Sequence, residues 1–182
     1  SEIIEGAKLI YSKIENAKRV QIYDESGVVV GTYPRDEASL GKDLSSRIYF
    51  QQTKDTYKGY ISQVTKDLSG SSTIVQTEPI FNDNHFLGMG GIEMDLSGIY
   101  RDFQEEVGTR FTVHAVDGSG AFVFDTDLAK IGQPADINAF VSNSKTTQGA
   151  LISSSYLKNS GWTIYIETPL APIFERASSI NI

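Results

Sequence analysis

The first part of the chain carries apolar residues at spacings of three and four, a pattern that predicts an amphipathic helix over residues 1–18. The positions that form this heptad-like seam are Ile3, Ala7, Ile10, Ile14 and Ala17. Charged side chains lie mostly off the seam. Two interpretations stay open: the seam packs on the helix's own domain, or it forms a homodimer with a partner helix or continues toward a membrane.

Beyond this helix the apolar residues alternate or gather in short runs, which is typical of β-strands. Residues 20–24 and 28–33 flank the turn Glu25-Ser26-Gly27 and therefore predict a β-hairpin. The other elements that the pattern predicts are strands at residues 60–64, 73–77 and 86–94, and a helix at residues 96–107 capped by Asp95.

Residues 44–64 form the most informative stretch of the chain. A short helix is expected to begin behind Asp43, a natural N-cap, and to end near Lys58-Gly59. Arg47 stands on this helix, two residues before Tyr49. The strand that follows alternates at Tyr60, Ser62 and Val64. An arginine beside aromatic side chains on a short helix that faces a strand can clamp a small carboxylate.

The pattern of the first hairpin returns later in the chain, which indicates an internal duplication. The positions that match at a constant offset of 93 are Val20, Asp24, Gly27 and Val30 with Val113, Asp117, Gly120 and Val123. Near the ends of the two halves, Ile92-Glu93 is echoed by Ile166-Glu167. We therefore predict an α+β fold with two tandem modules, each built on a central antiparallel sheet.

The predicted organisation has five parts. They are an N-terminal helix at 1–18, a first module at 19–96, a linking helix at 97–107, a smaller second module at 108–170 and an exit helix at 171–182. The second module lacks a counterpart of the Arg47 segment, and Glu167 is therefore interpreted as structural.

Composition narrows the range of partners. The 182 residues carry a net charge of −7, and no Lys/Arg cluster is longer than Lys18-Arg19, which argues against nucleic acid or an anionic membrane surface. Cysteine is absent, which excludes disulfides and thiolate chemistry and fits an oxidising compartment, although it equally permits the cytosol. There is neither a signal peptide nor an apolar run of membrane-spanning length, so we expect a fragment of a longer protein.

Catalytic motifs are lacking in the sequence. The two histidines, His85 and His114, lie in a turn and a strand without a convergent set of metal ligands. No phosphate-binding loop, nucleophile elbow or dinucleotide fingerprint occurs in its proper context. Asp125 and Asp127 form an acidic pair that would bind a cation only weakly. We therefore expect no enzymatic activity, no cofactor and no dedicated metal site.

A set of short motifs, taken in order, points to a known family. They are the hairpin D-x-x-G, then G-K-D-L-S-x-R-x-Y-F at 41–50, G-Y-x-S at 59–62, P-I-F at 79–81 and L-G-x-x-G-x-E-x-D-L at 87–96. Their order and spacing resemble the double Cache domain, a PAS-like sensor domain of bacterial and archaeal transmembrane receptors. The resemblance implies two PAS-like modules outside the cytoplasm, anchored to the membrane, with a small ligand in the first, membrane-distal module.

The resemblance also implies particular site residues. In the amino-acid-binding branch, an arginine and an aromatic residue hold the ligand carboxylate, and acids hold its ammonium group. These positions fall on Arg47, Tyr49, Asp67 and Glu93, and Tyr60 and Ser62 on the neighbouring strand complete the predicted set. The branch usually has aspartate in place of Glu93. Two tyrosines of the branch are replaced here by Lys42 and Thr65, which favours a carboxylate, or with Lys42 a dicarboxylate, over an α-amino acid.

Each candidate also has a purely structural interpretation. Arg47 could pair with Asp43, Asp67 could cap its turn, and Glu93 could form a salt bridge with Arg47. The two strand residues could simply pack in the sheet.

The sequence thus predicts an extracytoplasmic sensor domain that relays ligand occupancy to its C-terminal helix. Such domains drive histidine kinases, chemoreceptors or cyclic-dinucleotide enzymes. Two alternatives stay open, a ligand-free module for dimerisation and signal transmission, and a cytosolic PAS-like regulatory domain.

Overall fold

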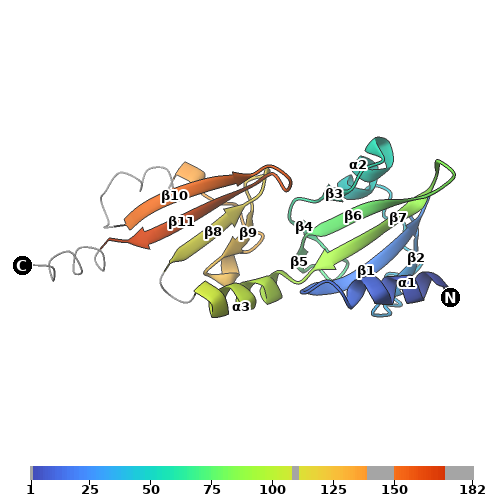
Figure 1. Ribbon diagram of the computed structural model, residues 1–182, viewed down its shortest axis with the longest axis horizontal. Helices are drawn as coiled ribbons and strands as arrows, with labels where there is room; N and C mark the ends of the chain where they lie inside the picture. The colour runs from blue at the N-terminus through green and yellow to red at the C-terminus, as the bar shows by residue number, and fades with distance from the viewer. Residues whose placement is uncertain (1, 108–110, 139–149, 171–182) are drawn as a thin grey trace, which may run out of the picture. The chain divides into compact units, whose positions relative to one another are not determined.

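The computed structural model describes residues 2–107, 111–138 and 150–170. The chain divides into two compact units, Ser1–Leu96 and Ser97–Ile182. Each unit combines helical segments with an antiparallel sheet (Figure 1), so the predicted α+β fold with two tandem modules is confirmed. None of the described helices is long and apolar enough to cross a membrane.

The first unit is built on a five-stranded antiparallel sheet in the order β2-β1-β7-β6-β3. Its helices are α1 (Glu2–Tyr11) and α2 (Ile48–Thr56). Its sheet strands are β1 (Ala17–Asp24), β2 (Val29–Tyr33), β3 (Tyr60–Ile61), β6 (Val75–Asn82) and β7 (His85–Met94). Two short strands, β4 (Thr65–Lys66) and β5 (Ser72–Thr73), form a separate ribbon.

Helix α1 packs on β1 and β2. The absence of a side chain at Gly31 makes room for it, because a Cβ there would lie 3.1 Å from Cγ2 of Ile3. The helix ends at Tyr11, so the predicted extent of residues 1–18 is wrong beyond that point. Asn16 turns the chain with φ of 58°, and Ala17 already pairs with Met94 of β7. Sheet pairing has therefore overridden the helical spacing of the last apolar positions.

The other face of the sheet is covered by α2. A buried cluster joins them, formed by Tyr23, Val29, Leu44, Tyr49, Phe50, Val75 and Met89. The prediction that this helix starts behind Asp43 is wrong, because Arg47 occupies the N-cap position. The Asp43 carboxylate instead accepts a hydrogen bond from the Ser45 amide, while residue 43 bridges to Val28. Tyr57 ends the helix in the left-handed conformation, with φ of 54°.

The second unit has a four-stranded sheet in the order β10-β11-β8-β9. Its elements are α3 (Leu96–Val107), β8 (Thr112–Val116), β9 (Phe122–Asp125), the 3₁₀ turn η1 (Leu128–Lys130), β10 (Ala150–Leu157) and β11 (Trp162–Pro169). Val116, Phe122 and Tyr165 form its core cluster. The exit helix predicted at 171–182 lies outside the described residues.

The two sheets confirm the internal duplication. Read from the first hairpin, β2-β1-β7-β6 of the first unit corresponds to β9-β8-β11-β10 of the second. Each hairpin turn is closed by one aspartate. Asp24 accepts hydrogen bonds from the Ser26 and Val28 amides, and Asp117 does the same with the amides two and four residues on. The offset of 93 therefore reflects a repeated structure.

Candidate functional site

The site begins with the side-chain alternation of β1. Because successive strand residues point to opposite faces, Arg19, Gln21 and Tyr23 share the face that α2 covers. Gln21 and Tyr23 are buried there, and the Tyr23 hydroxyl donates a hydrogen bond to Oε1 of Gln21 at 2.5 Å. Glu93 of β7 lies directly opposite Arg19 in the sheet register. This face therefore holds a buried polar cluster beneath the helix.

A pocket of about 260 Å³ opens between the start of α2, β3 and the segment that leads to β4. Its lining residues are Ser46, Arg47, Ile48, Tyr49, Tyr60, Ser62, Gln63, Val64 and Thr65. Ligand pockets for drug-sized molecules measure roughly 300–1,000 Å³, so this one suits a smaller molecule. Four of the six predicted site residues line it, and they come from two segments that the fold brings together.

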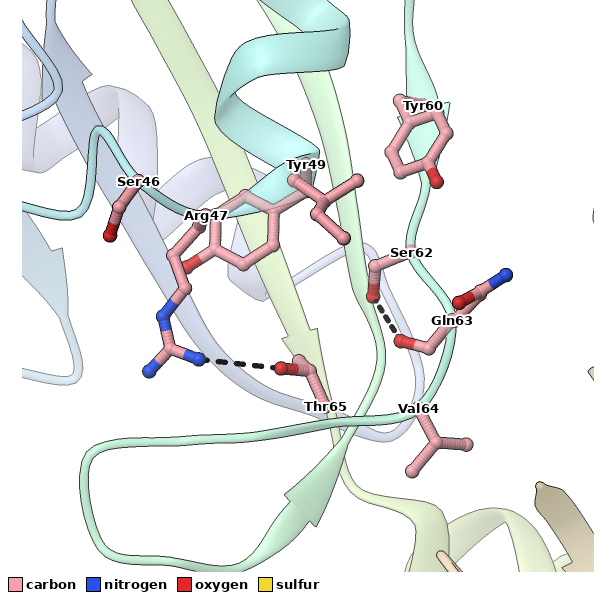
Figure 2. Close-up of a pocket in the computed structure, with 9 residues that line it drawn as sticks. Ser46, Arg47, Tyr49, Tyr60, Ser62, Gln63, Val64 and Thr65 are labelled. Atoms are coloured by element: carbon pink, nitrogen blue, oxygen red, sulfur yellow. Dashed lines mark hydrogen bonds between the residues drawn. The ribbon is translucent and has the colours of Figure 1, made fainter. Parts of the chain in front are cut away.

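Arg47 supplies the positive charge of the pocket. Figure 2 shows its side chain extending from the start of α2 toward Thr65, where Nη1 lies 3.4 Å from Oγ1. That distance makes a weak hydrogen bond. Within the described ranges no carboxylate lies at ion-pairing distance from the guanidinium, so neither suggested pair, with Asp43 or with Glu93, is formed. The half-buried guanidinium is therefore available to an anion.

Tyr49 forms a rigid wall beside Arg47. Its side chain is buried, and its ring meets the Tyr23 ring edge-to-face with centroids 6.3 Å apart. Burial raises the pKa of the Tyr49 hydroxyl, against the opposing effects of Tyr23 and of the Arg47 charge. The hydroxyl is therefore neutral at physiological pH. The adjacent Phe50 is buried in the same cluster.

The opposite side of the pocket comes from β3 and the residues after it. Tyr60 is half-buried and pairs with Thr77 across the sheet. The Ser62 hydroxyl accepts a hydrogen bond from the Val75 amide and donates one to the Gln63 carbonyl. Ser62 therefore fixes the backbone on this side of the pocket, while Tyr60 is among the residues that line it.

Asp67 lies outside the pocket lining and is held by Lys18 of β1. Lys18 Nζ lies 2.5 Å from Oδ2 of Asp67, while Oδ1 accepts hydrogen bonds from the Ser69 and Ser71 amides. Burial alone would raise the pKa of the Asp67 carboxyl, but hydrogen bonds from Lys18 and Ser69 outweigh it and lower the pKa to about 2. Asp67 thus both caps its turn, as the structural alternative predicted, and forms an ion pair.

Glu93 is also absent from the lining. It is buried, and its Oε2 lies 3.8 Å from Nη1 of Arg19 without a hydrogen bond. Burial raises the pKa of the Glu93 carboxyl, although the charge of Arg19 opposes this. Arg19 in turn pairs with Asp36 and donates a hydrogen bond to the Ser39 hydroxyl at 2.8 Å. The partner of Glu93 is therefore Arg19 rather than Arg47.

Five lining residues were not predicted as ligand contacts, namely Ser46, Ile48, Gln63, Val64 and Thr65. All lie in or beside the stretch 44–64 that the sequence singled out, so proximity to Arg47 and Tyr60 was the signal available. Lys42, suggested as a second cation, is exposed and does not line the pocket. Among the residues described, no group of three or more His, Asp or Glu side chains could hold a metal ion.

The fold, with two antiparallel sheets in tandem and a small pocket in the first unit, can be compared with those of known proteins. Neither a family model nor a curated protein matches the chain. Solved structures do match. An extracellular ligand-binding receptor from Desulfohalobium retbaense superposes with a TM-score of 0.76 at 15% identity, over 92% of this chain and 33% of that one. The chain thus spans about a third of that receptor.

Two further structures share the fold. The sensor domain of the histidine kinase DctB from V. cholerae has a TM-score of 0.63 at 16% identity, over 91% of this chain and 76% of that one. The ligand-binding domain of the chemoreceptor CtaA from Pseudomonas fluorescens, in complex with L-isoleucine, has a TM-score of 0.67 at 14% identity, over 96% of this chain and 85% of that one. These are sensor and ligand-binding domains rather than catalytic ones. The resemblance noted in the sequence is therefore confirmed at the level of the fold.

Proposed function

We propose that this chain is the extracytoplasmic sensor domain of a transmembrane signalling receptor, with a small carboxylate or amino acid bound in the first unit. The observation that supports this most is the half-buried Arg47 guanidinium, which faces the pocket and has no carboxylate at ion-pairing distance in the described part of the chain. An arginine in such a setting binds a carboxylate through paired, charge-assisted hydrogen bonds. A chemoreceptor domain of the same fold, CtaA, is found in complex with an amino acid.

The proposal assigns roles to the parts of the chain. Residues 19–96 form the membrane-distal, ligand-binding module, and 97–107 the linking helix. Residues 108–170 form the membrane-proximal module, and 171–182 the exit toward a membrane segment. Strand β7, which carries Glu93, runs into α3 with only Asp95 between them. A ligand can shift the equilibrium between two states only by its difference in affinity for them. Closure of the pocket on the ligand would supply that difference.

A thermal-shift screen of the purified chain against mono- and dicarboxylates, amino acids and amines tests the proposal. A ligand at 100 times its Kd adds about 2.7 kcal/mol of stability, which raises Tm by several degrees. Replacing Arg47 with Met should weaken binding of any carboxylate hit by at least about 30-fold, because the buried charge pair is lost. Arg35→Met is the matched control, since Arg35 is exposed and pairs with Glu37, two residues away.

Two outcomes would contradict the proposal. A hit that binds Arg47→Met and the wild type equally would place the ligand elsewhere. A folded wild-type protein that shows no shift with any member of the screen would favour the alternative of a ligand-free transmission module.

A further inference from the structure

The charges that line the pocket bear on the class of ligand. Among the residues that the structure describes, the lining contains one cation, Arg47, and neither aspartate nor glutamate. A ligand ammonium group placed in this pocket would lose its hydration without gaining a counter-charge, and burying an unpaired charge is costly. A ligand carboxylate, in contrast, would meet the guanidinium directly. The pocket alone therefore favours an anion over a zwitterion.

Each of the two acids that could have held an ammonium group has a cation of the protein close by. Asp67 is held by Lys18 at 2.5 Å, and Glu93 lies 3.8 Å from Arg19. Lys18 and Arg19 are consecutive residues of β1, and the sheet register fixes Arg19 opposite Glu93. The protein thus supplies both cations from one strand, and a ligand ammonium group would have to compete with them.

We propose that the pocket selects small carboxylates that carry no ammonium group, and that Lys18 and Arg19 act as built-in counterions to Asp67 and Glu93. This inference rests on the proposed ligand-binding function. The remaining lining suits a short, uncharged body, because Ile48 and Val64 are apolar and the Tyr60 ring offers a flat surface with a hydroxyl. Short 2-hydroxy acids and unsubstituted short carboxylates fit this description.

Isosteric pairs of ligands test the inference directly. The wild-type chain is titrated by calorimetry with five pairs: glycolate and glycine, L-lactate and L-alanine, 2-hydroxybutyrate and 2-aminobutyrate, 2-hydroxyisovalerate and valine, and 4-hydroxybutyrate and 4-aminobutyrate. The members of each pair are nearly equal in size and differ in the ammonium group. We expect at least one acid to bind, with the amino partner at least about 30-fold weaker, because an unpaired charge would be buried.

A second variant tests the counterion role. Lys18→Met releases the Asp67 carboxylate, so the preference for the acid over its amino partner should fall at least about 5-fold, since Asp67 can then attract the ammonium group. Lys66→Met removes the same charge from strand β4, where Lys66 is exposed and donates a hydrogen bond to the Ser72 hydroxyl, and should leave the ratio unchanged. Because the readout is a ratio within one variant, partial unfolding does not affect it.

The outcomes separate this inference from the proposed function. If an amino acid binds the wild type as tightly as its acid partner, or more tightly, the ligand-binding function stands and the selectivity is overturned. If the ratio in Lys18→Met equals that in the wild type, the counterion role is overturned. If no member of the panel binds the folded wild-type chain, both the inference and the carboxylate-binding function fail.

Discussion

At the scale of single residues, two arginines that the sequence does not distinguish have different partners in the structure. Arg19 is engaged by Asp36 and Glu93, whereas the Arg47 side chain hydrogen-bonds Thr65 and has no carboxylate at ion-pairing distance among the residues described. Local sequence identified Arg47 and Tyr49 because both lie on one short stretch. The partners of Asp67 and Glu93 come from β1, and no local pattern reveals that pairing.

The Lys18–Asp67 pair makes a prediction about pH. A carboxyl group whose pKa falls to about 2 on folding stabilises the folded state above its unfolded pKa near 4, and this stabilisation is lost as pH falls from about 4 toward 2. Asp67→Asn keeps a side-chain oxygen for the turn but removes the charge. Urea unfolding should therefore show a cost of about 2 kcal/mol at pH 7 that shrinks toward zero at pH 2.

The control for this experiment is Asp83→Asn, in the exposed turn between β6 and β7, where asparagine tolerates the positive φ of 46°. Its effect on the free energy of unfolding should be small at every pH. A cost at Asp67 that stays constant from pH 7 to pH 2 would show that the ion pair with Lys18 does not provide the stabilisation.

At the scale of elements, the sequence predicted the hairpins and the duplication well and the helix ends poorly. The hairpins depend on turn residues that are close together in the sequence, such as the aspartate and glycine of residues 24–27. The ends of α1 and the start of α2 depend on sheet pairing instead. Ala17 joins β7, and residue 43 bridges to Val28, so tertiary contacts override the capping and spacing signals at both positions.

Strand β7 contains a glycine that the sheet requires. Gly88 has φ of 141°, and a Cβ there would lie 2.0 Å from the carbonyl oxygen of Tyr23 in β1. Gly88→Ala should therefore lower the free energy of unfolding by at least about 3 kcal/mol. Gly120→Ala provides the comparison, since its φ of 84° is strained but nothing lies within 4 Å of the added atom, and it should cost only about 1 kcal/mol. Equal costs in denaturant titrations would contradict the account.

At the scale of the whole molecule, two copies of one module have diverged. The second sheet keeps the strand order of the first, and Glu167 lies opposite Thr112 where Glu93 lies opposite Arg19. Where the first unit has Gln21, the second has the buried His114, which contacts Asp125 at 2.6 Å. The duplication was visible in the sequence because its turns are alike. The different residues on the corresponding faces of the two sheets became apparent only from the strand register.

The relay proposed between the units predicts a change in α3. A saturating carboxylate ligand should slow amide hydrogen exchange in Leu96–Val107 several-fold, because β7 leads directly into this helix and the Asp95 amide donates to the Asn16 carbonyl at 2.7 Å. Mass spectrometry of peptides from the full chain, with Arg47→Met as control, measures this. Protection confined to 44–64, with α3 unchanged, would argue against the relay.

The central claim, that Arg47 holds the carboxylate of the ligand, is tested most directly by NMR of arginine side chains. The Nε–Hε signal of Arg47 is assigned by its absence in Arg47→Met, and the wild-type protein is titrated with the tightest ligand from the screen. We expect this signal to shift and to saturate together with binding, while the signal of Arg19, already engaged by Asp36 and Glu93, stays nearly fixed. Saturable binding that moves Arg19 and leaves Arg47 unchanged would contradict it.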